Sequence, residues 1–89
     1  MFKLTPYTLK RYEPNLKTYF FYNARRHSMW SIDAITGSVI ASLDGTNALE
    51  DIINEFLKNN SKLTYEELNE HFSKILEFLL KEDFVCEYI

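Results

Sequence analysis

Few side chains in this sequence are suited to chemistry, and their spacing does not form a catalytic or metal-binding set. The candidates for a base or a soft metal ligand are His27, His71 and Cys86. A structural zinc site needs four such ligands, so these three do not complete one. Cys86 is the single cysteine, and no conspicuous neighbour would activate its thiol. We therefore expect a protein that is not an enzyme and that uses no metal or other cofactor.

The composition predicts a packed globular chain, which we take as one domain over residues 1–89. Of its 89 residues, 46% are hydrophobic and 16% aromatic, and the net charge is only −3. Disordered chains have few aromatic residues and a high net charge. No apolar run approaches a membrane span, and residues 1–6 lack the apolar core of a signal peptide. We expect a cytoplasmic protein with no membrane partner.

Basic residues are too few and too scattered to favour a nucleic-acid partner. The one basic cluster is Arg25-Arg26 with His27, which reads as a solvated turn between two strands. Binding to a duplex needs clustered Lys and Arg that neutralise phosphates. We expect no nucleic-acid partner.

Alternation in residues 7–12 and 27–32, with a dense aromatic run at 18–23, predicts an antiparallel strand ribbon over residues 7–32. Its strands are expected at 7–12, 18–23 and 27–32, separated by Pro14-Asn15 and by the turn at 24–26. In the third strand, a period of two places Trp30 and Ile32 on the same face, toward the core.

Capping signals and apolar stripes predict three helices over residues 33–83. Asp33 is expected to cap a first helix over 34–43, which Gly37 weakens and Gly45 ends. Thr46 or Asn47 caps the second helix, and Glu50 completes a capping box if Asn47 is the cap.

The third helix has the clearest start signal of the chain. Residues 59–61 form the turn before it, and Thr64 with Glu67 makes a capping box that opens a helix over 65–82. Residues 84–89 alternate and predict a short final strand or an extended tail. The predicted fold is α+β and winged helix-turn-helix-like, with three N-terminal antiparallel strands followed by three helices.

Three segments in the middle of the chain resemble the PqqD family. They are Trp30–Asp33, Val39–Gly45 and Ala48–Ile53, and the most specific part is the Leu-Asp-Gly turn at 43–45 between two helices. The third helix is similar as well, with the family's apolar places held by Phe72, Ile75-Leu76, Leu79 and Phe84. Asp83 stands where the family has glycine. The resemblance covers about residues 7–85, and its residues are caps, turns and core.

The resemblance implies a stand-alone recognition element for ribosomally synthesised peptides. Such a domain binds the leader of a precursor peptide and presents it to a modifying enzyme, often a radical S-adenosylmethionine (SAM) enzyme. In the family, the peptide adds as a strand to the third strand and lies against the third helix. The implied contacts on the strand are Ser28, Met29, Trp30, Ser31 and Ile32, and those on the helix are Glu67, His71, Lys74, Ile75 and Phe78.

Other interpretations stay open at this point. Trp30 is more readily a core residue than a peptide contact. His71 is more readily a solvated helix residue than a pH-sensitive contact. Phe78 could be covered by the ribbon or by the C-terminal tail. The flank of the third helix that faces the peptide is also open.

Two other functions are considered beside peptide binding. The chain could be a small structural protein whose ribbon edge makes a dimer, so a monomer and a weak homodimer are both expected states. A winged-helix DNA-binding regulator is disfavoured, because residues 64–83 carry six acidic against two basic residues.

Overall fold

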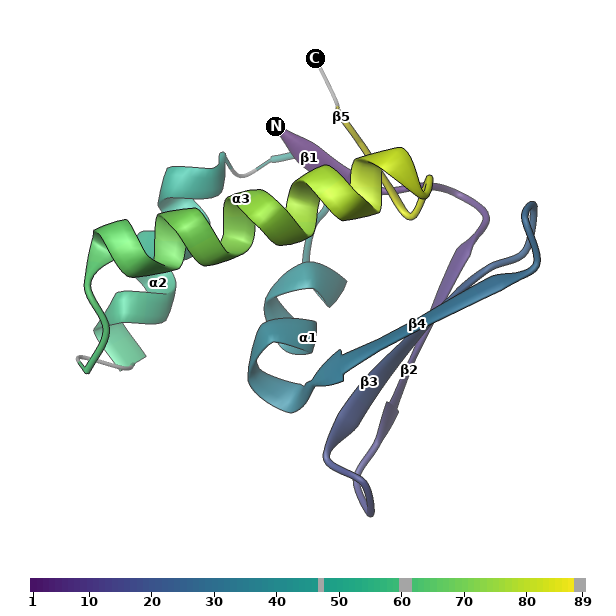
Figure 1. The fold of residues 1–89 in the computed structure, drawn as a ribbon, viewed down its shortest axis with the longest axis horizontal. Helices are drawn as coiled ribbons and strands as arrows, with labels where there is room; N and C mark the ends of the chain where they lie inside the picture. Colours follow the sequence, from purple (N-terminus) through teal and green to yellow (C-terminus); the bar gives the residue numbers. More distant parts are fainter. Residues whose placement is uncertain (47, 60–61, 88–89) are drawn as a thin grey trace.

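The computed structural model describes residues 1–46, 48–59 and 62–87, without the side chain of Asn59 (Figure 1). Strands precede and follow three helices, which confirms the expected α+β class. The strands are β1 (Phe2–Leu4), β2 (Thr8–Glu13), β3 (Thr18–Asn23), β4 (Ser28–Asp33) and β5 (Val85–Glu87), and the helices are α1 (Ala34–Ala41), α2 (Leu49–Asn59) and α3 (Tyr65–Lys81).

The strands form two separate antiparallel sheets. The first has the order β2-β3-β4, with Phe21 of β3 opposite Trp30 of β4 and Lys10 of β2. The predicted strands 7–12 and 27–32 each begin and end one residue later. His27 lies in the left-handed region, with φ 55°, and so belongs to the turn. In Figure 1 this sheet extends away from α2 and α3 on one side of the molecule.

The second sheet joins the two ends of the chain and contains a strand that the sequence analysis missed. β1 pairs with β5, so Leu4 lies opposite Val85. Phe2 also accepts a hydrogen bond from the Gly45 N–H, at 2.9 Å. Three residues are too few to show a period of two, which is why β1 was not predicted. β5 lies within the expected C-terminal segment, and residues 88–89 are outside the described residues.

α1 begins as expected and ends two residues early. Asp33 accepts a hydrogen bond from the Thr36 N–H at 2.9 Å and is the N-cap. After Ala41, the N–H groups of Ser42 and Leu43 donate to the carbonyls three residues earlier, as in a 3₁₀ turn. The Leu43 carbonyl then accepts a hydrogen bond from the Leu4 N–H. This bond to β1 turns the chain away from the helix axis. Gly45 takes the expected left-handed conformation, with φ 88°.

Gly37 allows α1 to lie directly on the sheet. A Cβ atom at this position would be 2.4 Å from the Cβ of Tyr19 on β3. The helix therefore gains from close packing what it loses in intrinsic propensity.

The start of α2 is described only in part. Asn47 and residues 60–61 lie outside the described residues, so the cap at Asn47 and the turn at 59–61 stay predictions. The Thr46 hydroxyl donates to Asp44 Oδ1 at 2.5 Å. The Ala48 N–H donates to Asp51 Oδ2 at 3.1 Å, which satisfies one free amide at the helix start.

Both ends of α3 have complete caps. The Thr64 hydroxyl accepts a hydrogen bond from the Glu67 N–H and donates to Glu67 Oε1, which confirms Thr64 as the N-cap. Glu82 is the C-cap instead of the last helical residue. Asp83 then takes φ 66°, and the Phe84 N–H donates to the Leu79 carbonyl at 2.9 Å. This is a Schellman motif, a turn that usually has glycine where Asp83 stands.

The hydrophobic core combines side chains of β3, the three helices and β5. Its largest fully buried side chains are Phe21, Ile40, Ile53, Phe72, Leu79, Phe84 and Val85.

Candidate peptide-binding site

The outer edge of β4 has the properties of a strand-binding site. Among the described residues, β4 pairs only with β3, so its other edge faces no strand. Residues 28–32 contain no charge and no proline. Exposed edges of this kind bind other strands readily, and most proteins protect them with charged residues.

Side chains of β4 alternate between two environments. Ser28, Trp30 and Ile32 are half-buried, and Trp30 and Ile32 pack against the core as their spacing predicts. Met29 and Ser31 lie on the opposite, outer face, where Met29 is 66% exposed. Of the five predicted strand contacts, Ser28, Trp30 and Ile32 therefore face the helices. Met29 and Ser31 face away from them.

An aromatic contact joins β4 to α3. The rings of Phe21 and Trp30 lie 5.5 Å apart, and those of Trp30 and Phe78 lie 6.1 Å apart. Phe78 remains 38% exposed, so the ribbon covers it only in part. An apolar surface is thus available where β4 and α3 meet.

The other predicted α3 contacts form a stripe that continues from Phe78. Glu67, His71, Lys74 and Phe78 follow spacings of four, three and four residues, which places them on one side of a helix, and all are exposed. Ile75 lies closer to the sheet and is half-buried against the core.

The structure brings only part of this stripe to β4. Phe78 contacts Trp30, whereas Lys74 pairs with Glu70 at 3.1 Å. Glu67 and His71 line a small hollow of about 280 Å³ with Leu63 and Leu68.

A buried asparagine, not predicted as functional, connects the turn between β3 and β4 to the end of α3. Asn23 is fully buried at the end of β3. Its Nδ2 donates to the Asp83 carbonyl at 2.9 Å, and its Oδ1 accepts from the N–H groups of Arg25 and Arg26, each at 2.9 Å. The Asn-Ala-Arg-Arg sequence is a turn signal that could have indicated this role.

Side chains around Asp83 strengthen the same connection. Its carboxylate accepts a hydrogen bond from the Tyr7 hydroxyl at 2.5 Å and lies 3.9 Å from Arg26 Nε. Arg26 also donates to the Lys81 carbonyl at 3.1 Å. These bonds explain how aspartate is held in a turn that favours glycine.

Ser28 shows unused hydrogen-bonding capacity at the start of β4. Its Oγ atom is buried and has no hydrogen-bond partner among the described residues. Buried hydroxyls are usually paired, so this position stands out within the candidate site.

Charge is distributed unevenly around the site. Residues 7–32 hold five basic residues and one acidic residue, whereas residues 33–83 hold eleven acidic and four basic residues. β4 therefore belongs to a basic ribbon and faces the acidic helix α3. A ligand between them would meet fields of opposite sign on its two sides.

Other kinds of site find little support in the described part of the chain. It contains no cluster of three or more His, Cys, Asp or Glu that could hold a metal ion. None of its helices is long and apolar enough to cross a bilayer. The Thr46 hydroxyl, with the Thr46 backbone N–H, holds the pKa of Asp44 below its ordinary value, but this pair lies outside the β4–α3 region.

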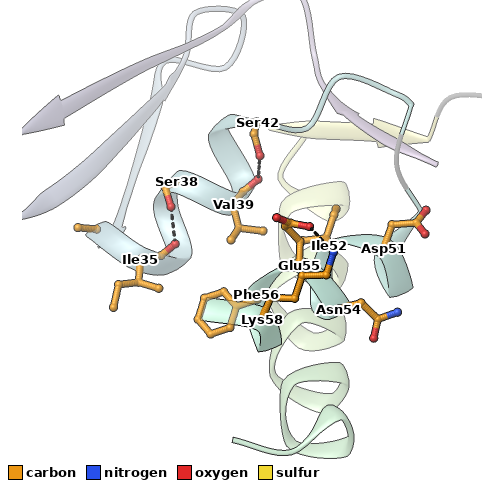
Figure 2. A pocket seen from close by; sticks show the side chains of 11 residues that line it. Ile35, Ser38, Val39, Ser42, Asp51, Ile52, Asn54, Glu55, Phe56 and Lys58 are labelled. Carbon is orange, nitrogen blue, oxygen red and sulfur yellow. Dashed lines mark hydrogen bonds and ion pairs between the residues drawn. The ribbon is translucent and has the colours of Figure 1, made fainter. Parts of the chain in front are cut away.

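Another cavity lies outside the β4–α3 region and was not predicted. It is a cleft of about 920 Å³ between α1 and α2, and Figure 2 shows side chains of both helices turned into it. Its shape depends on how α1 and α2 pack, which no local sequence pattern reveals.

Comparison with known proteins supports the fold directly. No family model matches the chain, and no curated protein shows a significant match. The fold of this chain is that of a protein whose structure was solved with a leader peptide bound. That structure, TbiB1 in complex with the TbiA(beta) leader peptide, matches with a TM-score of 0.82 over 98% of both chains, at 10% sequence identity. The likeness confirms the α+β fold expected from the resemblance, while the winged-helix description stays a prediction.

Proposed function

We propose that this chain binds the leader segment of a ribosomally synthesised precursor peptide by β-strand addition to β4. The observation that carries the proposal is the uncharged edge of residues 28–32, which faces no other strand among the described residues and adjoins the Trp30–Phe78 contact. The likeness to a structure solved with a leader peptide supports a leader peptide as the ligand.

Main-chain hydrogen bonds would supply much of the affinity. A strand of six residues, the length of β4, spans about 20 Å and offers alternate N–H and C=O groups to its partner. Every second peptide side chain would then point toward α3, where Phe78 and the adjoining stripe select it. We expect a dissociation constant on the order of micromolar to tens of nanomolar for an interface of this size.

The chemistry would belong to a partner enzyme. In this proposal the chain holds the leader, and a modifying enzyme, of the radical SAM class, acts on the remainder of the precursor. The chain itself supplies no catalytic group and no cofactor, and it works in the cytoplasm, where the precursor is made.

A titration followed by amide chemical shifts tests the site. The probe is a synthetic peptide with the leader sequence of the precursor encoded beside the gene for this chain. Shifts should concentrate at 28–32 and on α3 between residues 67 and 80. Shifts confined to α2 would refute binding at β4.

Methylating peptide nitrogens tests strand addition itself. Each N-methyl group removes one N–H, so a scan of successive positions should weaken binding at every second residue, by about tenfold per lost bond. The intervening N-methylated peptides are matched controls. A uniform effect along the scan would mean that side chains, and not the β4 main chain, bind the peptide.

A homodimer through the same edge is the second candidate. The edge of β4 could pair with β4 of another copy, because exposed strands associate with themselves as easily as with peptides. Light scattering over a range of concentrations separates the two. A persistent dimer that protects residues 28–32 would exclude peptide capture at this edge.

A further inference from the structure

The cleft between α1 and α2 is built from the outer side of α1. Ile35, Ser38, Val39 and Ser42 line it, with spacings of three, one and three residues that place them on one side of the helix. The buried residues of α1 form the other side, where Gly37 lies against Tyr19 of β3. The cleft therefore opens away from the sheet, and no residue of β4 lines it.

The floor of the cleft is apolar and accessible. Ile35 is 58% exposed, although it is a large aliphatic residue. Val39 on α1 and Ile52 and Phe56 on α2 are only half-buried, and Figure 2 shows them on the two sides of the opening. Contiguous accessible apolar residues of this kind mark interaction sites more often than ordinary surface.

The α2 side of the cleft is acidic. Asp51 and Glu55 line it with one basic residue, Lys58, whose Nζ lies 3.5 Å from Glu55 Oε2. α2 as a whole has three acidic residues and one basic residue, and it belongs to the strongly acidic part of the chain. A partner for this surface should combine apolar side chains with Lys or Arg.

We infer that the α1–α2 cleft is a docking site for the modifying enzyme, occupied by an amphipathic helix whose apolar side chains are flanked by basic residues. This inference rests on the proposed function, because it assumes that an enzyme receives the bound leader. An apolar groove between two helices is the usual receptor for such a helix. Charge disfavours a second copy docked through α2 or α3, since both helices are acidic as well.

The geometry explains why a separate docking site is useful. β4 and the cleft lie on different sides of α1, so the peptide and the enzyme could be held at the same time. Binding one would leave the other surface open, and the leader would be tethered near the enzyme at a high effective concentration.

Two substitutions in the cleft test the inference against matched controls. The variants are Ile35→Asp and Glu55→Lys, and the controls are Leu9→Asp, at a residue 60% exposed on β2, and Glu87→Lys, at an exposed residue of β5. The probes are the purified enzyme encoded beside this gene and the labelled leader peptide. Affinities for both are measured by calorimetry or fluorescence anisotropy at 50 and 300 mM salt.

We expect both cleft variants to weaken enzyme binding at least tenfold and to change leader affinity less than twofold. The controls should leave both affinities unchanged, and Glu55→Lys should reduce the salt dependence of enzyme binding. If Ile35→Asp proves unfolded by circular dichroism, Ser38→Arg replaces it, because arginine suits an exposed helical position and would fill the cleft.

Several outcomes would overturn the inference. They are failure of the wild-type chain to bind the enzyme, unchanged enzyme affinity in the cleft variants, and a parallel loss of leader affinity, which would make the cleft part of the peptide site. Self-association that Ile35→Asp abolishes would identify a second copy as the occupant. A wild-type chain that does not bind the leader, but whose binding to the enzyme is weakened by Ile35→Asp, would instead refute the proposed function alone.

Discussion

The two edges of the three-stranded sheet are protected to different degrees. β2 carries Lys10, Arg11 and Glu13 and lies between two prolines, whereas β4 has no charge from Ser28 to Ile32. Lys10 also reaches across to donate to the Ala41 carbonyl at the end of α1, at 2.7 Å. Charged residues and prolines are the usual means of preventing strand addition. Strand addition is therefore favoured at the β4 edge over the β2 edge.

The largest effect should come from the residue that connects the turn between β3 and β4 to the end of α3. Asn23→Ala would remove the bonds to Asp83, Arg25 and Arg26 and leave buried backbone groups unpaired. We expect a loss of about 2–4 kcal/mol in the free energy of unfolding, measured by urea denaturation. Asn54→Ala, at an exposed position of α2, is the control and should change it by less than about 0.5 kcal/mol. Equal losses in the two variants would contradict the role of Asn23.

Removing an aromatic ring beside each edge compares the two directly. Phe78 lies beside β4, and Tyr12 lies on β2, and they are 38% and 42% exposed. Phe78→Ala should weaken leader binding about tenfold, or about 1.4 kcal/mol, because the peptide loses its apolar contact on α3. Tyr12→Ala should leave the affinity within twofold. An equal loss from both, measured by fluorescence anisotropy, would place the peptide elsewhere.

Removing the basic charges of β2 should make the two edges more alike. In the double variant Lys10→Thr with Arg11→Thr, Glu13 is the one charged residue left on β2, and threonine is suited to strands. We expect this variant to self-associate more than the wild-type chain at the same concentration. Sedimentation velocity over a range of concentrations measures the difference. Lys17→Asn with Arg25→Thr removes the same charge outside the strands and is the control; asparagine suits the left-handed backbone of Lys17, with φ 50°. Self-association of both variants to the same extent would point to net charge as the cause.

Local signals in the sequence were sufficient to predict much of the fold. The caps at Asp33 and Thr64 are short-range hydrogen bonds, and the alternation of Trp30 and Ile32 is a property of any strand with one buried face. The candidate β4 edge could be predicted as well, because it follows from the order of strands and from the uncharged run at 28–32.

Long-range contacts account for what could not be predicted. β1 exists because β5 and residues 43–45 provide partners, not because of its own three residues. Asn23 acts on residues about 60 positions away, and the α1–α2 cleft depends on how the helices pack. The exact contacts of α3 with β4 depend on the same packing, so sequence could identify the stripe but not that Phe78 is the residue touching Trp30.

The smallest effect concerns a carboxylate remote from both edges. Hydrogen bonds from Thr46 lower the pKa of Asp44, so the charged form is favoured in the folded chain. An acid whose pKa is lowered by folding stabilises the folded state at pH values above its ordinary pKa. That contribution is lost as the pH falls through the pKa of the folded state. We therefore expect Asp44→Asn to lower stability slightly at pH 7 and to flatten the decline below about pH 4. Thermal melts from pH 7 to pH 3 measure this, and leader affinity at pH 7 should be the same in both proteins, since β4 does not depend on Asp44. A weaker affinity in the variant would mean that the loop after α1 positions the open edge, which would link the two regions that the structure keeps apart.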